Sequence, residues 1–241
     1  MKASAIEFRF RYLIHTVVYC LGFTAPWNAW LHLDTVRTWQ WLASWPARAG
    51  WMSFSASTNG VLLLGIVFAL AGAALRTWGA AYMSPGVVQD SSMHGGRVVA
   101  AGPYRYMRNP LYLGIFLHTF ALALLMMPSG ALFTIIVIGL LQLRLMFAEE
   151  AFLTAKLGEP YRAYCAAVPR IVPSLRARVP QSAARPAWGV ALLGEIYMWG
   201  VVLSFVAFGW KYNAFLIIQG VVVSLGVSIV ARAFVPKPTT A

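Results

Sequence analysis

The sequence predicts an all-α fold, a bundle of about six transmembrane helices. Apolar residues make up 60% of its 241 residues and charged residues only 11%, against roughly 25% in an ordinary soluble domain. The charges are clustered, and several uncharged runs between them exceed the about 20 residues that a helix needs to cross a hydrocarbon core. The alternating pattern of membrane-barrel strands is absent. Because a bilayer offers no water to backbone polar groups, we expect these runs to be helices.

The expected helices follow the apolar runs in order. The first run has no clear small-residue cleavage site, so we interpret it as a retained span and not as a signal peptide. The run 109–143 is too long for one span, and Met-Pro-Ser-Gly at 127–130 predicts a turn between the two helices of a hairpin. The six expected spans cover roughly residues 12–33, 60–82, 111–127, 129–147, 188–210 and 212–234.

The net charge of +12 predicts the orientation. A nucleic-acid-binding protein would gather Lys and Arg on a soluble face beside aromatic residues, whereas here they lie between apolar runs. With six spans both termini lie on one side, and placing them in the cytosol leaves only Arg37, Arg48 and Lys211 of the 19 Lys and Arg outside. We therefore expect a multi-pass protein of a bacterial inner membrane, or of the endoplasmic reticulum in a eukaryote, with no nucleic-acid partner.

Two features predict no chemistry of their own. The Trp-rich segment 37–59 is expected to be an interfacial loop on the outer side, because amphipathic rings favour the headgroup region; a role as a substrate lid stays open. Cys20 and Cys165 are too few for a disulfide framework or a zinc cluster. We therefore expect no metal site.

The sharpest motif runs from Gly102 to Gly114 and reads Gly-Pro-Tyr-Arg-Tyr-Met-Arg-Asn-Pro-Leu-Tyr-Leu-Gly. Its first two residues predict a turn, and Pro110 presets the first turn of the third expected span, whose free N–H groups then face the cytosol. Arginines and tyrosines beside a helix N-terminus can form an anion-binding site with aromatic walls. Interfacial anchoring of the span end would use the same residue types.

A second motif follows the fourth expected span. Glu149 and Glu150 are adjacent in a chain that has only 7 Asp and Glu. On a helix they point roughly 100° apart, so we expect them to do different jobs. The motif continues as Leu-Gly-Glu-Pro-Tyr-Arg-Ala-Tyr at 157–164 and Val-Pro-Arg-Ile-Val-Pro at 168–173.

Together the two motifs resemble the integral-membrane methyltransferases, which include isoprenylcysteine carboxyl methyltransferase and the phosphatidylethanolamine N-methyltransferase group. The resemblance rests on Gly-Pro-Tyr-Arg-x-x-Arg-Asn-Pro-x-Tyr-x-Gly, then Glu-Glu-x-x-Leu about 35 residues later, then Gly-x-x-Tyr-x-x-Tyr. It covers about 70–173, including Gly72, Arg76 and Trp78 of a looser upstream pattern. We accordingly divide the chain into a methyltransferase-like region, 1–187, and an additional C-terminal transmembrane hairpin, 188–241.

The resemblance implies an enzyme that uses S-adenosylmethionine, bound in a cytosolic pocket at the ends of the third and fourth spans and roofed by the segment after Glu150. The acceptor would be lipophilic or membrane-partitioned and would react through a carboxylate, an amine or a thiol. Arg108 and Glu150 are the candidate catalytic residues. The candidate cofactor-binding residues are Tyr104, Arg105, Asn109, Pro110, Tyr112, Gly114, Glu149, Tyr161 and Tyr164. The family often has His where this chain has Asn109.

The chemistry of this donor suits these residue types. Aromatic faces and carboxylates stabilise its cationic sulfonium, and an arginine can pair with its carboxylate. Proximity and orientation supply most of the acceleration, so no covalent intermediate is needed. We expect Glu149 or Glu150 to hold the amino or ribose groups, and Arg108 to anchor the cofactor or an anionic acceptor. A carboxylate acceptor is slightly favoured, since an amine must lose a proton and only His94, in a cytosolic loop, suggests a base.

Polar residues inside the other spans have plainer explanations. Glu195 is expected to pair with an arginine such as Arg76 or Arg185, although an intramembrane acid can also be functional. His15 and His118 are expected to make hydrogen bonds between helices and not to bind haem.

Two other function classes stay open. A membrane isoprenoid or sterol reductase would bind NADPH, and such reductases resemble the same family, although the Gly-rich phosphate-binding motif is absent. A small transporter would have intramembrane charges lining a path, or an inverted repeat. The sequence has only Glu195 as an intramembrane acid and shows no evident internal repeat.

The orientation can be tested with reporter fusions. We expect a fusion at Lys211 to report the outer side and a fusion after Ala241 to report the cytosol, because one span separates the two positions. Reporters on the same side of the membrane would contradict the six-span arrangement.

Overall fold

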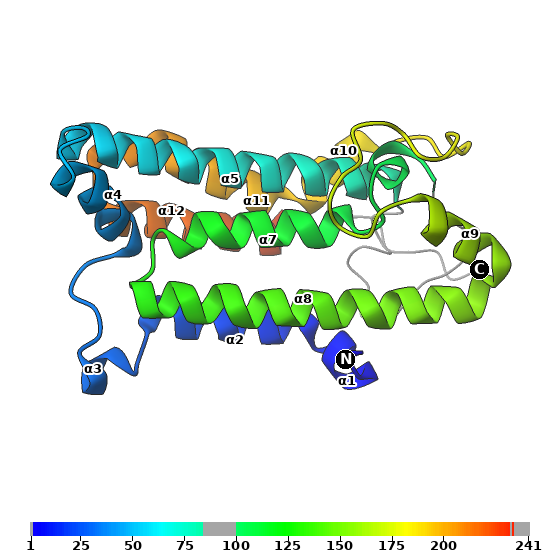
Figure 1. Cartoon of the computed structure of the whole chain (residues 1–241), viewed down its shortest axis with the longest axis horizontal. Helices are drawn as coiled ribbons and strands as arrows, with labels where there is room; N and C mark the ends of the chain where they lie inside the picture. The colour runs from blue at the N-terminus through cyan, green and yellow to red at the C-terminus, as the bar shows by residue number, and fades with distance from the viewer. Residues whose placement is uncertain (1, 84–99, 232, 234–241) are drawn as a thin grey trace.

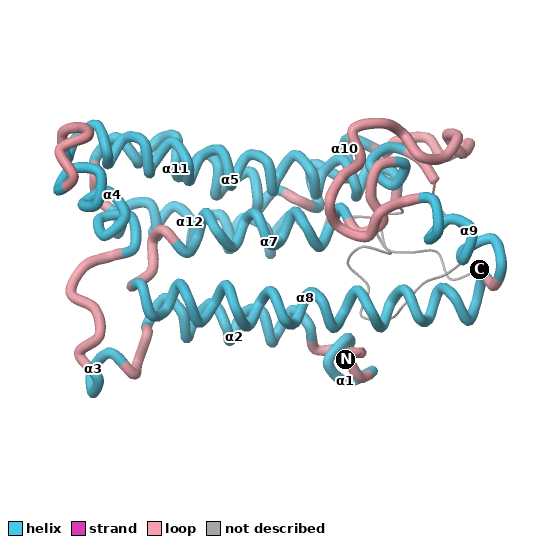
Figure 2. The backbone as a smooth tube through the Cα atoms, viewed as in Figure 1, coloured by secondary structure: helices cyan, strands magenta, loops and turns pink. Residues whose placement is uncertain are grey.

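The computed structural model describes residues 2–83, 100–231 and 233, and within them it contains helices and no strand (Figures 1 and 2). This confirms the all-α prediction. The His94 loop lies outside the described residues. The elements are α1 (Ala5–Arg9), α2 (Arg11–Thr24), α3 (Asn28–Leu31), α4 (Thr38–Arg48), α5 (Phe54–Tyr82), η1 (Gly102–Arg105), α7 (Pro110–Ala123), α8 (Pro128–Leu157), α9 (Glu159–Ala167), α10 (Trp188–Gly194), α11 (Ile196–Phe208), η2 (Gly209–Lys211) and α12 (Ala214–Ala231).

The long helices lie side by side and alternate in direction along the chain (Figure 1). One end of the bundle carries η1 and α9 and is called the motif end; the other carries α4 and the α7–α8 turn and is called the turn end. Helices α5 and α8 have 29 and 30 residues, or about 43 and 45 Å, which exceeds the roughly 30 Å of a hydrocarbon core. Both helices are therefore long enough to continue beyond the bilayer.

Three described helices are long and apolar enough to cross a membrane, namely α5, α8 and α12, and the bent pair from Trp188 to Lys211 would make a fourth. The expected spans 12–33 and 111–127 appear as helices of 14 residues each. Helix α2 stops early because Ala25 adopts a left-handed conformation immediately before Pro26. The expected span 188–210 appears as two helices, α10 and α11, that bend by 67° at Glu195.

The predicted hairpin at 109–143 is confirmed, but its turn lies at 124–127 and not at 127–130, because α8 already begins at Pro128. The loop expected at 37–59 is wrong, because Thr38–Arg48 forms α4. Helix α4 starts where the turn offers free carbonyls: the Thr38 and Trp39 N–H groups donate to the carbonyls of Met126 and Leu124 over 2.9 and 3.0 Å. The segment therefore closes the turn end of the bundle.

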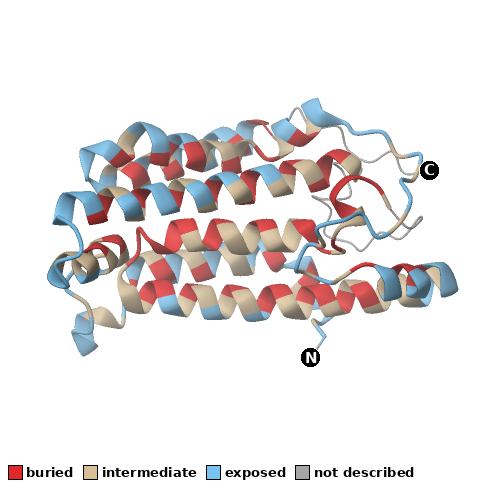
Figure 3. Cartoon of the chain, turned by 45° about the horizontal axis from the view of Figure 1, so that its top comes forward, coloured by how far each residue is buried: buried red, intermediate tan, exposed pale blue. Residues whose placement is uncertain are grey.

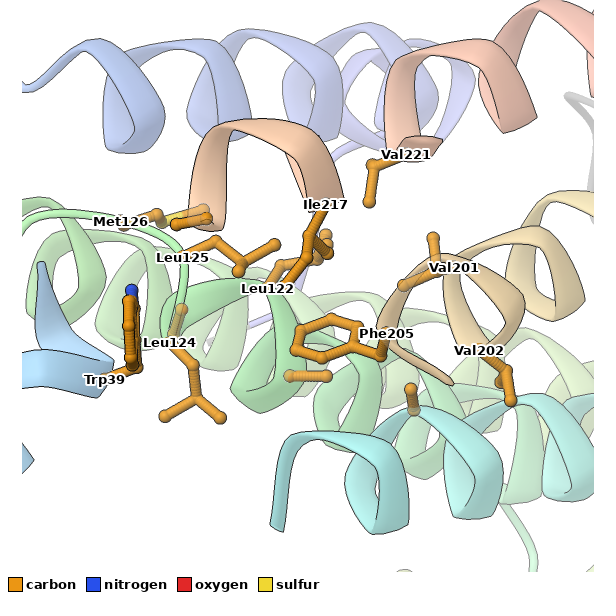
Figure 4. Close-up of a cluster of buried hydrophobic side chains, with 14 of the residues drawn as sticks. Trp39, Leu122, Leu124, Leu125, Met126, Val201, Val202, Phe205, Ile217 and Val221 are labelled. Atoms are coloured by element: carbon orange, nitrogen blue, oxygen red, sulfur yellow. The ribbon is translucent and has the colours of Figure 1, made fainter. Parts of the chain in front are cut away.

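The main apolar core joins α5 and α7 to α11 and α12 (Figure 4). Leu122 and Leu125 pack there with Phe205 and Ile217, all fully buried. Exposed positions lie on the outward faces of the helices (Figure 3), and on α12 they include Val222 and Val223, which suits contact with lipid tails. Residues 188–231 are thus an integral part of the bundle.

Helices α5 and α7 approach each other most closely at two glycines. A Cβ placed on Gly72 would lie 2.8 Å from the Gly114 carbonyl oxygen and 3.1 Å from the His118 backbone nitrogen. A Cβ on Gly114 would in turn lie 3.0 Å from the Gly72 carbonyl oxygen. Because these neighbours are backbone atoms, they cannot move aside, and only residues without a side chain fit.

The predicted pairing of Glu195 with Arg76 is confirmed. Arg76 donates from Nε and from a terminal nitrogen to the two oxygens of Glu195, both over 2.6 Å. Their side chains are 12% and 6% exposed. A charge at this depth needs such a partner, and this two-point geometry fastens the bend between α10 and α11 to α5.

Breaking this ion pair should destabilise the fold strongly. We expect Glu195→Gln to lower the free energy of unfolding in detergent by about 3–5 kcal/mol, because Arg76 stays buried without its counter-charge. The matched change Glu7→Gln should cost below about 1 kcal/mol, since the Glu7–Arg144 pair is one-third exposed. Equal losses in the two variants would contradict a structural role for the buried pair.

The close approach of α5 and α7 can be tested with one methyl group. Gly72→Ala should destabilise the protein by about 1–3 kcal/mol through overpacking. Gly60→Ala, on the same helix with nothing within 4 Å of the added Cβ, should be neutral or slightly stabilising. Thermal unfolding in one detergent compares the two, and an unaffected Gly72→Ala would show that the helices can separate freely.

Candidate active site

Two parts of the chain that are far apart in sequence are joined at the motif end. The segment after α9 lies along the motif that precedes α7 and is bound to it through the backbone. The Arg108 and Asn109 N–H groups donate to the carbonyls of Pro169 and Arg170, over 2.9 and 3.2 Å. Further along, three more backbone bonds join Ser174 to Tyr106, Arg178 to Arg105, and Ser182 to Ala100.

The motif itself is shaped by its turn residues. Gly102 has φ of +55°, which favours glycine, and a Cβ there would overlap the ring of Tyr82. Pro110 is the first residue of α7, as expected from its fixed φ and missing N–H. Asn109 therefore stands directly before the helix, with its side chain free to bond elsewhere.

Glu150 is the centre of a cluster of donors. Its carboxylate accepts from Asn109 Nδ2 over 2.9 Å and from Arg170 Nε over 3.0 Å, and it lies 3.5 Å from Arg108 Nε. Glu150 is 8% exposed. Two guanidinium groups and an amide offset the cost of removing the carboxylate from water. The candidate residues Arg108, Asn109 and Glu150 are thus brought together from α8 and the segment before α7.

Glu149 has a different environment. It accepts a hydrogen bond of 2.7 Å from the phenol of Tyr112, one turn into α7. Adjacent carboxylates on α8 therefore bond to different segments, as the angle between neighbouring helical positions predicts.

The tyrosines form the wall between α9 and η1. Tyr164 donates from its phenol to the Tyr104 carbonyl over 2.8 Å, and the rings of Tyr161 and Tyr164 lie 5.8 Å apart. Burial, followed by the charge of Glu149, raises the pKa of Tyr104 well above its usual value. Its phenol is therefore a neutral donor near pH 7, and it has no hydrogen-bond partner among the described residues.

A hollow of about 390 Å³ adjoins the Glu150 cluster. Phe147 and Arg170 stand together in its wall, with the guanidinium carbon 4.8 Å from the ring centre. The hollow also contacts Lys2 and Thr154. A carboxylate, two cations and an aromatic face around one space suit a small zwitterionic ligand.

Three of the candidate cofactor-binding residues make contacts that stabilise the protein itself. Arg105 points to the roof, where it donates to the Val179 carbonyl over 3.0 Å and to Gln181 Oε1 over 3.3 Å. Gly114 packs against α5, and Pro110 starts α7. Conversely, Arg170 belongs to the cluster although it was not predicted. The Val-Pro-Arg sequence marked the segment, but nothing local indicates that its arginine folds back onto Glu150.

The two histidines of the spans differ. His15 lies 2.8 Å through Nε2 from Gln142 Nε2, which confirms an interhelical contact for it. His118 is 2% exposed, and neither of its ring nitrogens has a partner among the described residues. The expected hydrogen bond of His118 is therefore not found.

Residues 56–159 match the phospholipid methyltransferase family. This central region is therefore similar to membrane methyltransferases of the phospholipid methyltransferase family. The match includes α5, η1, α7 and α8, and with them both acids of the second motif and the whole first motif. The match ends before Tyr161, Tyr164 and Arg170. The resemblance found from the sequence motifs covers about 70–173 and includes these three residues. No curated protein and no solved structure matches the chain significantly.

Proposed function

We propose that the protein transfers a methyl group from S-adenosylmethionine to a lipophilic acceptor at the cytosolic face of the membrane. The observation that carries the proposal is the cluster on Glu150, where the two motifs of a methyltransferase domain meet within hydrogen-bonding distance. Because the cluster stands in the last turns of α8, beyond a span of ordinary length, it would face water and headgroups.

The residues present fit this cofactor. Two buried polar atoms of the first motif, the Tyr104 phenol oxygen and Arg108 Nε, have no hydrogen-bond partner among the described residues. Arg108 and Arg170 can hold a carboxylate, and Glu149 and Glu150 can hold an ammonium group or hydroxyls. When bound, S-adenosylmethionine would supply a methyl carbon on a cationic sulfonium, whose carbon–sulfur electron pair leaves with the sulfur.

In such a reaction the protein's contribution is to position the acceptor and the methyl donor. The Arg108 backbone N–H donates to the Pro169 carbonyl, and its side chain forms an ion pair with Glu150 without a hydrogen bond, at 3.5 Å from Nε. Fixed groups of this kind align the acceptor with the methyl carbon and exclude water, which accounts for most of the acceleration in an in-line displacement. A carboxylate acceptor can attack with an existing lone pair, and no proton then has to be removed.

Cofactor titration tests the proposal. Purified protein in detergent should bind S-adenosylmethionine, and Glu150→Gln should weaken binding by roughly tenfold or more, since it removes a charged hydrogen-bond acceptor worth about 1.5–3 kcal/mol. Arg108→Ala should weaken it similarly. Glu159→Gln, which makes the same change in a pair that is 79% exposed on the acid side, should not.

Each outcome has a separate meaning. Absence of binding by the wild type at high micromolar cofactor would contradict the proposed function, and binding of NADPH in its place would favour a reductase. Wild-type binding that neither Glu150→Gln nor Arg108→Ala changes would refute the site while leaving the activity standing. Thermal unfolding of each variant separates loss of the site from loss of the fold.

A further inference from the structure

The first two helices pack onto α8 close to the second motif. Phe8 of α1 is buried with Leu141 and Leu145 of α8, in what is called the Phe8 cluster below. Because Leu145 and Glu149 are four residues apart on α8, this cluster lies on the helix face that carries Glu149. Helices α1 and α2 precede residue 56, where the family match begins. Any part that they play in the candidate site is therefore outside what the match describes.

Arg11, the first residue of α2, places a buried cation beside the Phe8 cluster. It is 9% exposed. Its guanidinium carbon lies 4.4 Å from the ring centre of Phe8 and 4.6 Å from that of Tyr12, and a terminal nitrogen donates to the Phe8 carbonyl over 2.9 Å. These contacts fix the position of the side chain. A cation removed from water in this way is stabilised by negative charge nearby.

Glu149 is joined to the same cluster through Tyr112. The ring of Tyr112 packs against the Phe8 cluster, and its phenol donates to Glu149 over 2.7 Å. Unlike Glu150, which has two arginines beside it, Glu149 has no Lys or Arg nitrogen within 4 Å among the described residues. Because its hydrogen-bond partner is a neutral phenol, a negative charge on Glu149 needs a further source of stabilisation.

The charge of Arg11 supplies this stabilisation. Burial raises the pKa of the Glu149 carboxyl, the hydrogen bond from Tyr112 and the charge of Arg11 lower it, and the adjacent charge of Glu150 raises it. Further titratable groups interact with Glu149 from α7, η1 and α9, namely the phenols of Tyr112, Tyr104 and Tyr161. Arg11 therefore contributes positive charge to a group of phenols and acids.

We propose that Arg11 is a positioning residue of the candidate active site, which keeps the Glu149 carboxylate ionised so that it can accept from the ammonium group or a hydroxyl of the methyl donor. The proposal rests on the proposed function for the identity of this ligand. An ammonium group has only donors, so an ionised carboxylate attracts it, whereas a protonated carboxyl is neutral and presents a donor of its own. The N-terminal helices thus take part in the chemistry of the site.

Infrared difference spectroscopy of the full-length protein in lipid nanodiscs reads the charge of Glu149 without any cofactor. Comparing each protein with the same protein carrying Glu149→Gln isolates the C=O band of the protonated Glu149 carboxyl, which disappears as the pH rises. In Arg11→Gln we expect this band to persist to higher pH than in the wild type, because a nearby positive charge has been removed. Arg11→Lys keeps the charge, and its band should follow that of the wild type.

Titration with S-adenosylmethionine tests the consequence for binding. Relative to the wild type at the same pH, Arg11→Gln should weaken binding by about tenfold at a pH of roughly 6 and by under about twofold at a pH of roughly 8, where Glu149 is ionised in both proteins. A role in folding alone would weaken binding equally at both pH values. Arg9→Gln removes the same charge from an exposed position of α1 and should bind as the wild type does.

The two measurements keep the hypotheses apart. A carboxyl band that titrates alike in the wild type and Arg11→Gln, or binding that weakens equally at both pH values, would overturn the proposal. A band that shifts in a protein that binds no cofactor would refute the proposed function and keep the coupling of Arg11 to Glu149. Should Arg11→Gln fail to fold, Arg11→Met repeats the test with a flexible, unbranched side chain between the rings of Phe8 and Tyr12.

Discussion

A charged side chain in apolar surroundings must find its counterpart within the protein, and most of this architecture depends on how a few acids meet that constraint. Glu195 fastens the C-terminal helices to α5, and Glu149 joins α8 to α7. Glu150 binds both Asn109, before α7, and Arg170, in the segment after α9. Two acids that are only partly buried also join segments: Glu7 ties α1 to α8, and Asp34 accepts from the backbone and side chain of Ser129 at the start of α8. Each of these five carboxylates holds two segments together.

The sequence alone predicted those parts of the fold that depend on local pattern. Uncharged runs located the long helices, Met-Pro-Ser-Gly at 127–130 indicated a hairpin whose turn lies three residues earlier, and the cost of an intramembrane acid pointed to the Arg76–Glu195 pair. The errors arose where distant contacts decide. Helix α4 uses carbonyls of a turn more than eighty residues later, and the bend at Glu195 depends on an arginine from α5. The hydropathy pattern of the sequence predicts neither of these contacts.

Most residues of the candidate cluster could be predicted from the sequence, but their arrangement in space was harder to predict. The resemblance to membrane methyltransferases implied that Asn109, Arg108 and Glu150 belong to one site, and helical periodicity separated Glu149 from Glu150. Arg170 could not be found this way, because its place beside Glu150 results from backbone pairing between the roof and the motif. Gly114 was predicted to bind the cofactor, and in the fold it is a point where α7 touches α5, which the sequence did not indicate.

The length of α8 has a mechanical consequence. One unbroken helix joins Ser129, fixed to Asp34 at the turn end, to Glu150, and the two residues are therefore about 30 Å apart along a rigid rod. A bilayer that thickens or thins cannot shorten this rod and must be accommodated by tilt or by lipid deformation. The position of the Glu150 cluster relative to the headgroups is thus set jointly by the protein and by the thickness of the membrane around it.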